Sequence, residues 1–253
     1  MKALVLAAGK GERLRPLTET IPKPMLELGG RPLIHYPLMM LRQAGIRQIA
    51  VNVHHLADRI QSGLGDGSAL GLEITYAPET VLLGTGGPLC GLRDFFGGEP
   101  FAVANADTVM DLDVAAMVEL HRARGAVATF ALFRPANLDA YSRLEIDREG
   151  RLRRMRLLTG KHGAFEDFPP APPPCEVEPY MFCGLYICGP EVYEAMPPAG
   201  PFSSMKDLFA PMLLRGLPLY GYVHRGLFRT VDDLATYENL KREFASNPPR
   251  LRA

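Results

Sequence analysis

Hydrophobic residues come in short runs separated by segments of helical periodicity. Residues 2–8, 46–53, 72–77, 101–104 and 126–133 are apolar and mostly lack alternation, which is typical of strands covered on both faces. Helices are predicted between them, at residues 32–44, 57–62 and 113–124, and another opens at residues 84–87. Because strands alternate with helices, we predict an α/β fold with a doubly wound, mostly parallel sheet.

The second half of the chain is organised differently. Strands are predicted at residues 143–146 and 182–187, helices at 190–195, 205–215 and 234–244, and a frayed tail at 246–253. Residues 168–179 contain six prolines, which exclude a helix. We therefore predict that residues 160–179 lack regular structure and form an extended surface loop or a lid.

Composition narrows the class of protein. The 253 residues are 47% hydrophobic and 22% charged, as in an ordinary packed globule, and 28 basic residues balance 28 acidic ones. A zero balance gives no electrostatic footprint for nucleic acid. Apolar runs stay below the ~18 residues that span a bilayer, so we expect no membrane partner and a cytoplasmic location. The cysteines lack CxxC spacing and are expected to be buried free thiols: Cys90, Cys175, Cys183 and Cys188.

The densest chemical signal follows the first predicted strand, in residues 6–18 (LAAGKGERLRPLT) and 21–25 (IPKPM). Gly9 and Gly11 let a ligand approach the backbone, and successive N–H groups there can form an anion-binding nest. Arg13, Arg15 and Lys23 add positive charge to the same loop. In open α/β sheets, ligands bind beyond the carboxyl ends of the strands. The loop therefore suits a polyphosphate.

This string resembles the N-terminal signature of the sugar-1-phosphate nucleotidyltransferases, LAAGxGxRLxPLTxxxPKPM. Residues 79–87 (ETVLLGTGG), 105–107 (NAD) and 182–187 (FCGLYI) resemble further segments of that family. The resemblance implies a Rossmann-like nucleotidyltransferase fold with a smaller sugar-binding subregion. It also implies one domain over residues 1–245, with a nucleotide-binding half (1–135) and a sugar-binding half (136–245).

The family's reaction sets the expected partners. It is the Mg²⁺-dependent transfer of a nucleotidyl group from a nucleoside triphosphate to a sugar 1-phosphate, with release of pyrophosphate. The LAAG string resembles uridylyl- and thymidylyltransferases, whereas the ETVLLGTGGP segment resembles guanylyltransferases. On balance the resemblance favours UTP, with GTP next.

The resemblance also implies roles for individual residues. Two cations of the glycine loop would be catalytic, Arg13 on the departing pyrophosphate and Lys23 between the two phosphates. Fixed cations at these places would offset the repulsion between two anionic substrates. The other nucleotide-binding residues would be Ala7, Ala8, Gly9, Gly11, Glu79, Gly84 and Thr85, and the sugar-binding residues Asn105 and Gly184.

Two carboxylates are expected to hold Mg²⁺, which prefers oxygen ligands. Asp107 matches the aspartate of the family's NGD segment, with Ala106 in place of glycine. Residues 231–240 (VDDLATYENL) resemble the family's W-x-D-[VI]-G-T-x-E-x-L motif, and alignment on Thr236 puts Asp233 at the second ligand. Asp232 is the competing candidate, and either aspartate could instead cap the last helix.

Sugar recognition and the competing functions stay open. The family's Glu-Lys-Pro motif is absent from residues 151–163, whose basic run we interpret as one solvated strand face. A nicotinamide oxidoreductase is disfavoured, since Leu14 replaces the third glycine of its fingerprint. A cytidylyltransferase acting on a phosphoalcohol and a non-catalytic nucleotide-sugar sensor remain alternatives. His54 and His55 lack the spacing of a helical zinc site, and we interpret them as structural.

Overall fold

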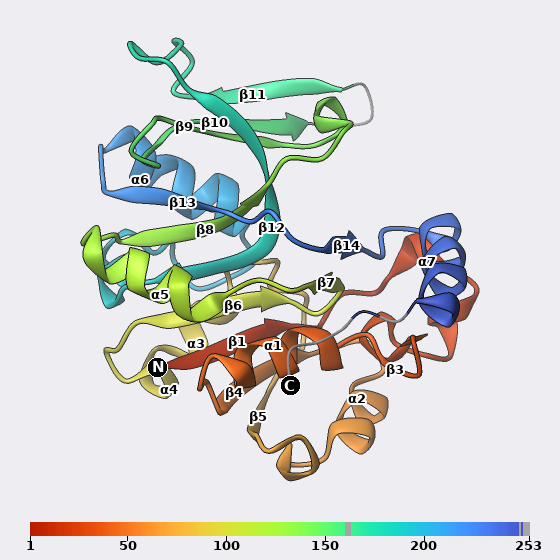
Figure 1. The fold of residues 1–253 in the computed structure, drawn as a ribbon. Helices are drawn as coiled ribbons and strands as arrows, with labels where there is room; N and C mark the ends of the chain where they lie inside the picture. Colours follow the sequence, from red (N-terminus) through yellow and green to blue (C-terminus); the bar gives the residue numbers. More distant parts are fainter. Residues whose placement is uncertain (160–162, 248, 250–253) are drawn as a thin grey trace. The chain divides into compact units, whose positions relative to one another are not determined.

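The structure is a computed structural model that describes residues 1–159, 163–247 and 249 (Figure 1). The chain folds into two compact units. The first unit comprises Met1–Leu82, Val103–Val114 and Gly226–Ala253, and the second comprises Leu83–Ala102 and Ala115–Arg225. The predicted α/β class is confirmed. The division into nucleotide-binding and sugar-binding halves stays a prediction, because compactness does not reveal which ligand a unit binds.

The first unit is built on parallel strands. Strand β1 pairs in parallel with β4, and β4 pairs in parallel with β5, in the order β6-β1-β4-β5 (Figure 1). Two small antiparallel pairs, β2 with β3 and β7 with β14, complete its strands. The elements are β1 (Lys2–Leu6), β2 (Glu27–Leu28), β3 (Arg31–Pro32), α1 (His35–Gln43), β4 (Gln48–Val53), α2 (Ala57–Leu64), β5 (Glu73–Pro78), β6 (Phe101–Asn105, which begins in the second unit), β7 (Thr108–Met110), β14 (Phe228–Thr230) and α7 (Leu234–Ser246).

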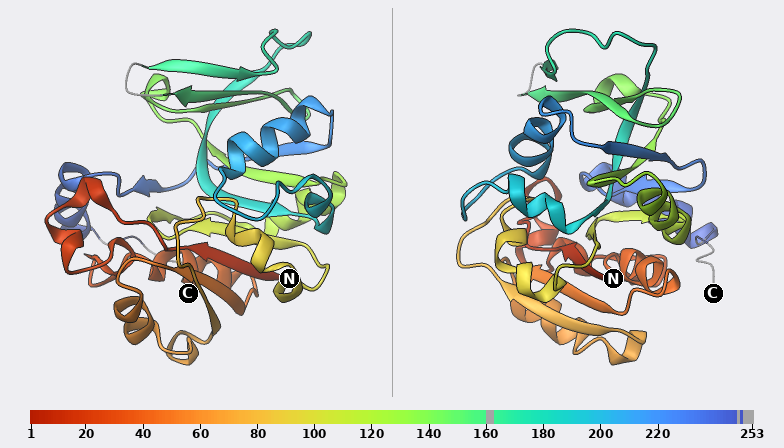
Figure 2. Two further views of the ribbon diagram at one scale, coloured as in Figure 1. Left: turned by 180° about the vertical axis from the view of Figure 1, so that it is seen from behind. Right: turned by 90° about the vertical axis from the view of Figure 1, so that its left-hand side faces the viewer.

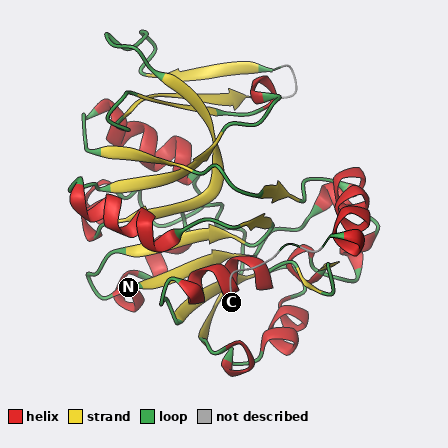
Figure 3. Ribbon diagram, viewed as in Figure 1, coloured by secondary structure: helices red, strands yellow, loops and turns green. Residues whose placement is uncertain are grey.

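Burial explains why these runs form strands. Residues 3–5 of β1 and 49–51 of β4 are fully buried, as their unbroken apolar runs predict. Helix α1 lies beside β1, as the red helices and yellow strands of Figure 3 show. Helix α7 packs in the same unit on a cluster that joins distant parts of the chain: Leu14, Leu26, Leu28, Leu33, Tyr36, Val109, Val231, Tyr237, Leu240 and Phe244. This burial ties the C-terminal helix to the segment that follows the glycine loop.

The second unit is largely antiparallel. Its strands run in the order β11-β10-β9-β12, and β8 pairs with both β12 and β13 (Figure 2). Its elements are α3 (Pro88–Gly91), α4 (Arg93–Phe96), α5 (Val114–Ala123, whose first residue belongs to the first unit), β8 (Ala128–Phe133), β9 (Arg143–Ile146), β10 (Leu152–Thr159), β11 (Ala164–Phe168), β12 (Glu178–Cys188), α6 (Ala210–Leu214) and β13 (Leu219–Val223). The helix predicted at residues 205–215 consists of a π-helix, Ser204–Phe209, followed by α6.

The prediction that residues 160–179 lack regular structure is wrong for part of the segment. Residues 164–168 form β11, which pairs with β10 in register from Met155↔Phe168 to Thr159↔Ala164, and β12 begins at Glu178. The prolines keep residues 169–177 out of helices and strands, as expected. Residues 160–162 lie outside the described residues. The expected lid role stays a prediction.

The basic run on β10, the strand that pairs with β11, does not form the single solvated face that was expected. Arg154 and Arg156 both form ion pairs with Asp167 across the β10–β11 pair, and their side chains are only 14% and 29% exposed. Arg153 pairs with the buried Asp147 at 2.5 Å. The interpretation of this run as one solvated face is therefore wrong, because acidic partners on neighbouring segments take up its charges.

The cysteines match their expectation only in part. All four cysteines are free, as expected, but Cys175 is exposed and Cys90 is only partly buried. In the part of the chain that the structure describes, no helix is both long enough and apolar enough to cross a membrane.

Packing explains the glycines of residues 84–87. Gly84 has φ +74°, and a Cβ there would lie 2.5 Å from the carbonyl oxygen of Phe202. Phe202 also donates its N–H to Leu83 O (3.1 Å) and accepts from Gly86 N–H (3.0 Å), while Ser204 N–H donates to Thr85 Oγ1 (2.9 Å). Helix α3 follows directly, as predicted. The motif is therefore fixed against residues 202–204 by bonds within the second unit.

Replacing Gly84 by alanine should destabilise the protein. The Gly84→Ala change combines a left-handed backbone with an overlap against a backbone carbonyl, so we expect a loss of about 2 kcal/mol or more in the free energy of unfolding. Urea unfolding measures it. Gly91→Ala is the matched control: its Cβ meets no described atom within 4 Å, and the change should be neutral or slightly stabilising. Equal losses in the two variants would contradict this account.

Candidate functional site

The glycine loop after β1 is held in place by its own chain. Gly11 adopts φ +63°, and a Cβ there would lie 2.9 Å from Thr18 Cγ2. Thr18 Oγ1 donates to Gly11 O (2.9 Å), and His55 Nε2 hydrogen-bonds to Thr18 O (2.7 Å). His55 is thus structural, as predicted. Gly9 differs, since it is exposed and no described atom lies within 4 Å of a Cβ built on it. The loop is therefore rigid around Gly11 and open at Gly9.

Lys23 and Asp107, 84 positions apart in the chain, form an ion pair. Asp107 follows β6, and Lys23 begins a short 3₁₀ turn, Lys23–Met25. The side chains are 14% and 27% exposed, so both charges are largely removed from water. The structure thus brings together the predicted catalytic lysine and the predicted metal ligand.

A second carboxylate joins this pair through strand pairing. Strand β14 lies antiparallel to β7 with Thr230 opposite Thr108, and Val231 N–H donates to Asp107 O (3.1 Å). The chain then continues to Asp232, whose Oδ1 lies 3.7 Å from Arg13 Nη2. We call Arg13, Lys23, Asp107 and Asp232 the charged cluster.

The pKa of Asp232 reflects its neighbours. Burial and the carboxylate of Asp107 raise this pKa, while Lys23 and Arg13 oppose the shift. The charged form of Asp232 is therefore held at a cost in the folded protein. Two close carboxylates with incomplete compensation are an arrangement that a cation would relieve.

Asp233 has a different task. Its Oδ1 accepts from Thr236 N–H (2.8 Å) and from Thr236 Oγ1 (2.7 Å), so it is the N-cap of α7. These hydrogen bonds lower the pKa of Asp233. Alignment on Thr236 assigned the metal to Asp233, whereas in the structure Asp232 is the aspartate that belongs to the charged cluster. Of the two roles that the sequence left open, the structure assigns the helix cap to Asp233. The metal role, given to Asp233 with Asp232 as the competing candidate, stays a prediction.

A buried asparagine connects three strand ends, and the sequence analysis missed it. Asn52 of β4 is 2% exposed; its Oδ1 accepts from Ala7 N–H (2.7 Å) and its Nδ2 donates to Glu79 Oε1 (2.7 Å). Because the N–H of Ala7 is engaged here, any nucleotide contact of Ala7 must use other atoms. The sequence signal that could have revealed this residue was its carboxamide side chain within the otherwise apolar run of residues 49–53.

The remaining predicted residues are distributed over both units. Ala8 is buried after β1, and Asn105 ends β6, both in the first unit. Gly84, Thr85 and Gly184 belong to the second unit. Gly184 has φ +82° and lies in β12, where the pairing with β8 is irregular between Phe182 and Tyr186. A glycine is favoured there by the backbone alone, and its contact with a sugar stays a prediction.

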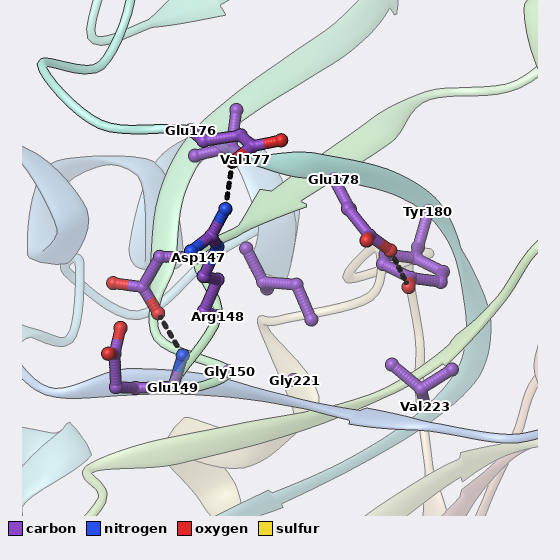
Figure 4. A pocket seen from close by; sticks show the side chains of 11 residues that line it. Asp147, Arg148, Glu149, Gly150, Glu176, Val177, Glu178, Tyr180, Gly221 and Val223 are labelled. Atoms are coloured by element: carbon purple, nitrogen blue, oxygen red, sulfur yellow. Dashed lines mark hydrogen bonds and ion pairs between the residues drawn. The ribbon is translucent and has the colours of Figure 1, made fainter.

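A pocket of about 400 Å³ lies in the second unit (Figure 4). Its walls are the turn at residues 146–150, residues 176–178 and 180, Gly221 and Val223. Glu176 and Arg148 form an ion pair (2.6 Å) on its rim, and Tyr180 donates a hydrogen bond to Glu178 (Figure 4). None of the predicted site residues lines this pocket. Its acidic side chains already have partners or are exposed, and we assign it no role.

Comparison with known proteins identifies the family. The nucleotidyl transferase family model matches residues 2–227. A UTP–glucose-1-phosphate uridylyltransferase of Synechocystis sp. is 36% identical over 233 residues, which cover 87% of this chain and 57% of that protein. A mannose-1-phosphate guanylyltransferase of Mycobacterium tuberculosis is 31% identical over 241 residues, covering 95% of this chain and 62% of that protein. The chain thus spans about three fifths of the length of these curated relatives.

A solved structure supports the fold. HddC from Yersinia pseudotuberculosis superposes with a TM-score of 0.74 at 22% identity, covering 96% of this chain and 99% of that one. This likeness agrees with the predicted Rossmann-like architecture. Because the family model covers most of the sequence, a stretch that includes the glycine loop, Lys23 and Asp107, the chain belongs to the nucleotidyl transferase family.

Proposed function

We propose that this protein transfers a nucleotidyl group from a nucleoside triphosphate to a sugar 1-phosphate and releases pyrophosphate. The observation that carries the proposal is the charged cluster beside the glycine loop. A phosphoryl oxygen of the sugar 1-phosphate would attack the α-phosphorus, and the bond to the β-phosphate would break. Both substrates are anions, so the reaction needs fixed positive charge where they meet.

The chain's own cations suit this task. Lys23 is largely buried and is held by Asp107 before any substrate binds, so little reorganisation is needed when negative charge builds up. Arg13 is 71% exposed and lies 3.7 Å from Asp232 (Nη2 to Oδ1), and it is the residue we assign to the departing pyrophosphate. Gly9 and Gly11 give the triphosphate access to backbone N–H groups.

We propose that Mg²⁺ is the cofactor and that Asp107 and Asp232 would hold it. The fit rests on the way the two carboxylates are brought together: Val231, which precedes Asp232, donates its N–H to Asp107 O (3.1 Å). Burial and the nearby charge of Asp107 also raise the pKa of Asp232. The described residues contain no group of three or more His, Cys, Asp or Glu side chains able to form a closed metal centre. Mg²⁺ usually takes one or two carboxylates together with phosphate and water oxygens, so a pair suffices. When bound, it would neutralise charge on the triphosphate.

UTP is our favoured donor and GTP the next. A uridylyltransferase and a guanylyltransferase are both among the similar proteins, at 36% and 31% identity. A carboxylate at Glu79 can accept hydrogen bonds from uracil N3–H and from guanine N1–H alike. The alternatives are a cytidylyltransferase acting on a phosphoalcohol and a non-catalytic nucleotide-sugar sensor.

Replacing Lys23 should abolish most of the activity. Lys23→Ala removes a preorganised donor, and such losses are worth about 3–4 kcal/mol, or about 100- to 1000-fold in turnover. Pyrophosphate release measures the rate, with circular dichroism as the folding control. Lys241→Ala on the exposed face of α7 removes the same charge elsewhere and should keep wild-type turnover. A folded Lys23→Ala variant with more than about a tenth of wild-type rate would contradict the role.

Replacing Asp232 and replacing Asp233 should have opposite effects on turnover and on stability. Asp232→Asn should abolish Mg²⁺-dependent turnover, as should Asp107→Asn. Asp232→Asn should not lower the free energy of unfolding in Mg²⁺-free buffer at neutral pH, because the raised pKa of Asp232 means that folding disfavours its charged form. Asp233→Ala should instead lower the free energy of unfolding by about 1 kcal/mol through loss of the N-cap and leave most turnover intact. The reverse pattern would assign the metal to Asp233.

A substrate panel tests the reaction itself. UTP, GTP, CTP, ATP and dTTP would each be offered with several sugar 1-phosphates and with phosphocholine, and pyrophosphate would be measured. We expect release with UTP, or with GTP next, and only when a sugar 1-phosphate is present. Release with CTP and phosphocholine would favour the cytidylyltransferase, and nucleotide-sugar binding without any release would favour the sensor.

A further inference from the structure

We propose that Lys23 has a second task in the free protein: its ion pair with Asp107 keeps bare divalent cations off the proposed metal site. The inference rests on the proposed function, in which Asp107 and Asp232 would hold Mg²⁺. With Lys23 in place, the site would accept the metal only as a complex with the triphosphate. This task concerns the form in which the cofactor binds, and it is separate from the stabilisation of the reacting phosphates.

The backbone around Lys23 has a fixed conformation. Lys23 stands between Pro22 and Pro24, and prolines restrict the backbone angles on both sides of it. Met25 N–H donates to Pro22 O (2.8 Å), which closes the turn that begins at Lys23. Leu26 N–H donates to Lys23 O (3.1 Å), and the Leu26 side chain is buried in the core of the first unit. The lysine side chain therefore starts from a rigid point of the fold.

The lysine side chain leads from the glycine loop to Asp107. A Cβ built on Gly11 would lie 3.1 Å from Lys23 Cβ, so the start of the side chain packs directly against that loop. At the other end, Lys23 Nζ donates a hydrogen bond to Asp107 Oδ2. Both side chains are largely buried, so solvent and salt screen this pair less than they screen a surface pair. The charge of Asp107 is therefore compensated before any ligand binds.

The other members bring the charged cluster to formal neutrality. Asp232 adds one negative charge, and Arg13 adds one positive charge 3.7 Å from it (Nη2 to Oδ1). The charges of Asp107 and Lys23 both act on Asp232, so the two carboxylates share the compensation. Asp233, the next acid along the chain, is engaged as the N-cap of α7. The charged cluster therefore offers a bare divalent cation no net negative charge.

A bare cation and a metal–triphosphate complex would interact with this site differently. The ammonium group of Lys23 repels a divalent ion that approaches Asp107, at close range and in poorly screening surroundings. A triphosphate carries more negative charge than one divalent ion neutralises, so Lys23 and Arg13 attract its metal complex. Lys23 need not leave Asp107, because an ammonium group has further N–H donors to offer to a phosphate. The same lysine thus disfavours the ion alone and favours the complex.

Removing the charge of Lys23 should open the site to bare cations. Lys23→Met keeps an unbranched apolar stem but removes the ammonium group. Asp107 is then a largely buried carboxylate without its cation, which should lower the stability of the protein in metal-free buffer. Mn²⁺ accepts the same oxygen ligands as Mg²⁺ and is the probe we choose. Added Mn²⁺ should replace the lost charge and restore stability.

Three further variants separate this role from a general effect of charge. Lys23→Arg keeps a cation beside Asp107 and should exclude Mn²⁺ as wild type does. Lys10→Met is the matched control, because it removes a lysine charge from an exposed position of the glycine loop. Exposed charges are screened, so Lys10→Met should change the affinity for Mn²⁺ by less than about 3-fold. Lys23→Met/Asp107→Asn removes the carboxylate as well and should lose the affinity that Lys23→Met gains.

Titration of the purified protein with Mn²⁺, followed by the electron paramagnetic resonance signal of the free ion, tests the inference without nucleotide. We expect Lys23→Met to bind Mn²⁺ at least 10-fold more tightly than wild type, about 1.4 kcal/mol. Thermal melting, first with EDTA and then with Mn²⁺, gives a second readout. Mn²⁺ should raise the melting temperature of Lys23→Met and leave that of wild type unchanged, because only a state that binds the ion is stabilised by it.

The outcomes distinguish the inference from the proposed function. The role of Lys23 is overturned if Lys23→Met binds Mn²⁺ no more tightly than wild type, or if the gain survives in Lys23→Met/Asp107→Asn. It is also overturned, without any Lys23 variant, if Mn²⁺ alone stabilises wild type but not Asp107→Asn. In each case, Mn²⁺ retained by wild type with UTP or GTP on ultrafiltration, together with pyrophosphate release, would still support the transferase. Wild type that retains Mn²⁺ neither alone nor with nucleotide would contradict the proposed cofactor and the inference together.

Discussion

The ion pair between Lys23 and Asp107 is the contact around which the charged cluster is arranged. It joins the segment after the glycine loop to the end of β6, and both side chains are largely withdrawn from water. Asp232 adds a second negative charge and Arg13 a second positive one. The four charges balance formally, but burial and the nearby carboxylate of Asp107 raise the pKa of Asp232 against the opposing effects of Lys23 and Arg13, so its charged form is disfavoured. Such a residual cost is what a substrate or metal ion can relieve on binding.

Rigidity around this cluster comes from side chains that do no chemistry in the proposed reaction. Thr18 donates a hydrogen bond to Gly11 O and is itself bonded to His55, and Asn52 accepts one from Ala7 N–H. The pairing of β14 with β7 positions the segment that leads to Asp232. A site that is already in place before its ligands bind loses little free energy to reorganisation. The loop is therefore fixed by hydrogen bonds at Gly11 and Ala7 while Gly9 remains exposed between them.

Much of this arrangement follows from the sequence, and the exceptions have physical reasons. Unbroken apolar runs predicted β1 and β4, and the family resemblance singled out both Lys23 and Asp107, which the structure joins in an ion pair. The three-residue strands β7 and β14 carry no periodicity, so the pairing that brings Asp232 to Asp107 was not predictable. Local pattern likewise could not show that Asp167 on β11 would neutralise the arginines of β10. Both failures concern pairings between strands, which local periodicity does not encode.

The proposed function depends most on the cation site that Asp107 and Asp232 would form together next to Lys23. A crystal of the protein with Mn²⁺ and a non-hydrolysable UTP or GTP analogue would test it through the anomalous signal of the metal. We expect one ion in contact with carboxylate oxygens of both Asp107 and Asp232 and with phosphate oxygens, while Asp233 still caps α7. An ion bound by Asp233 in place of Asp232, or one bound by neither Asp107 nor Asp232, would contradict it.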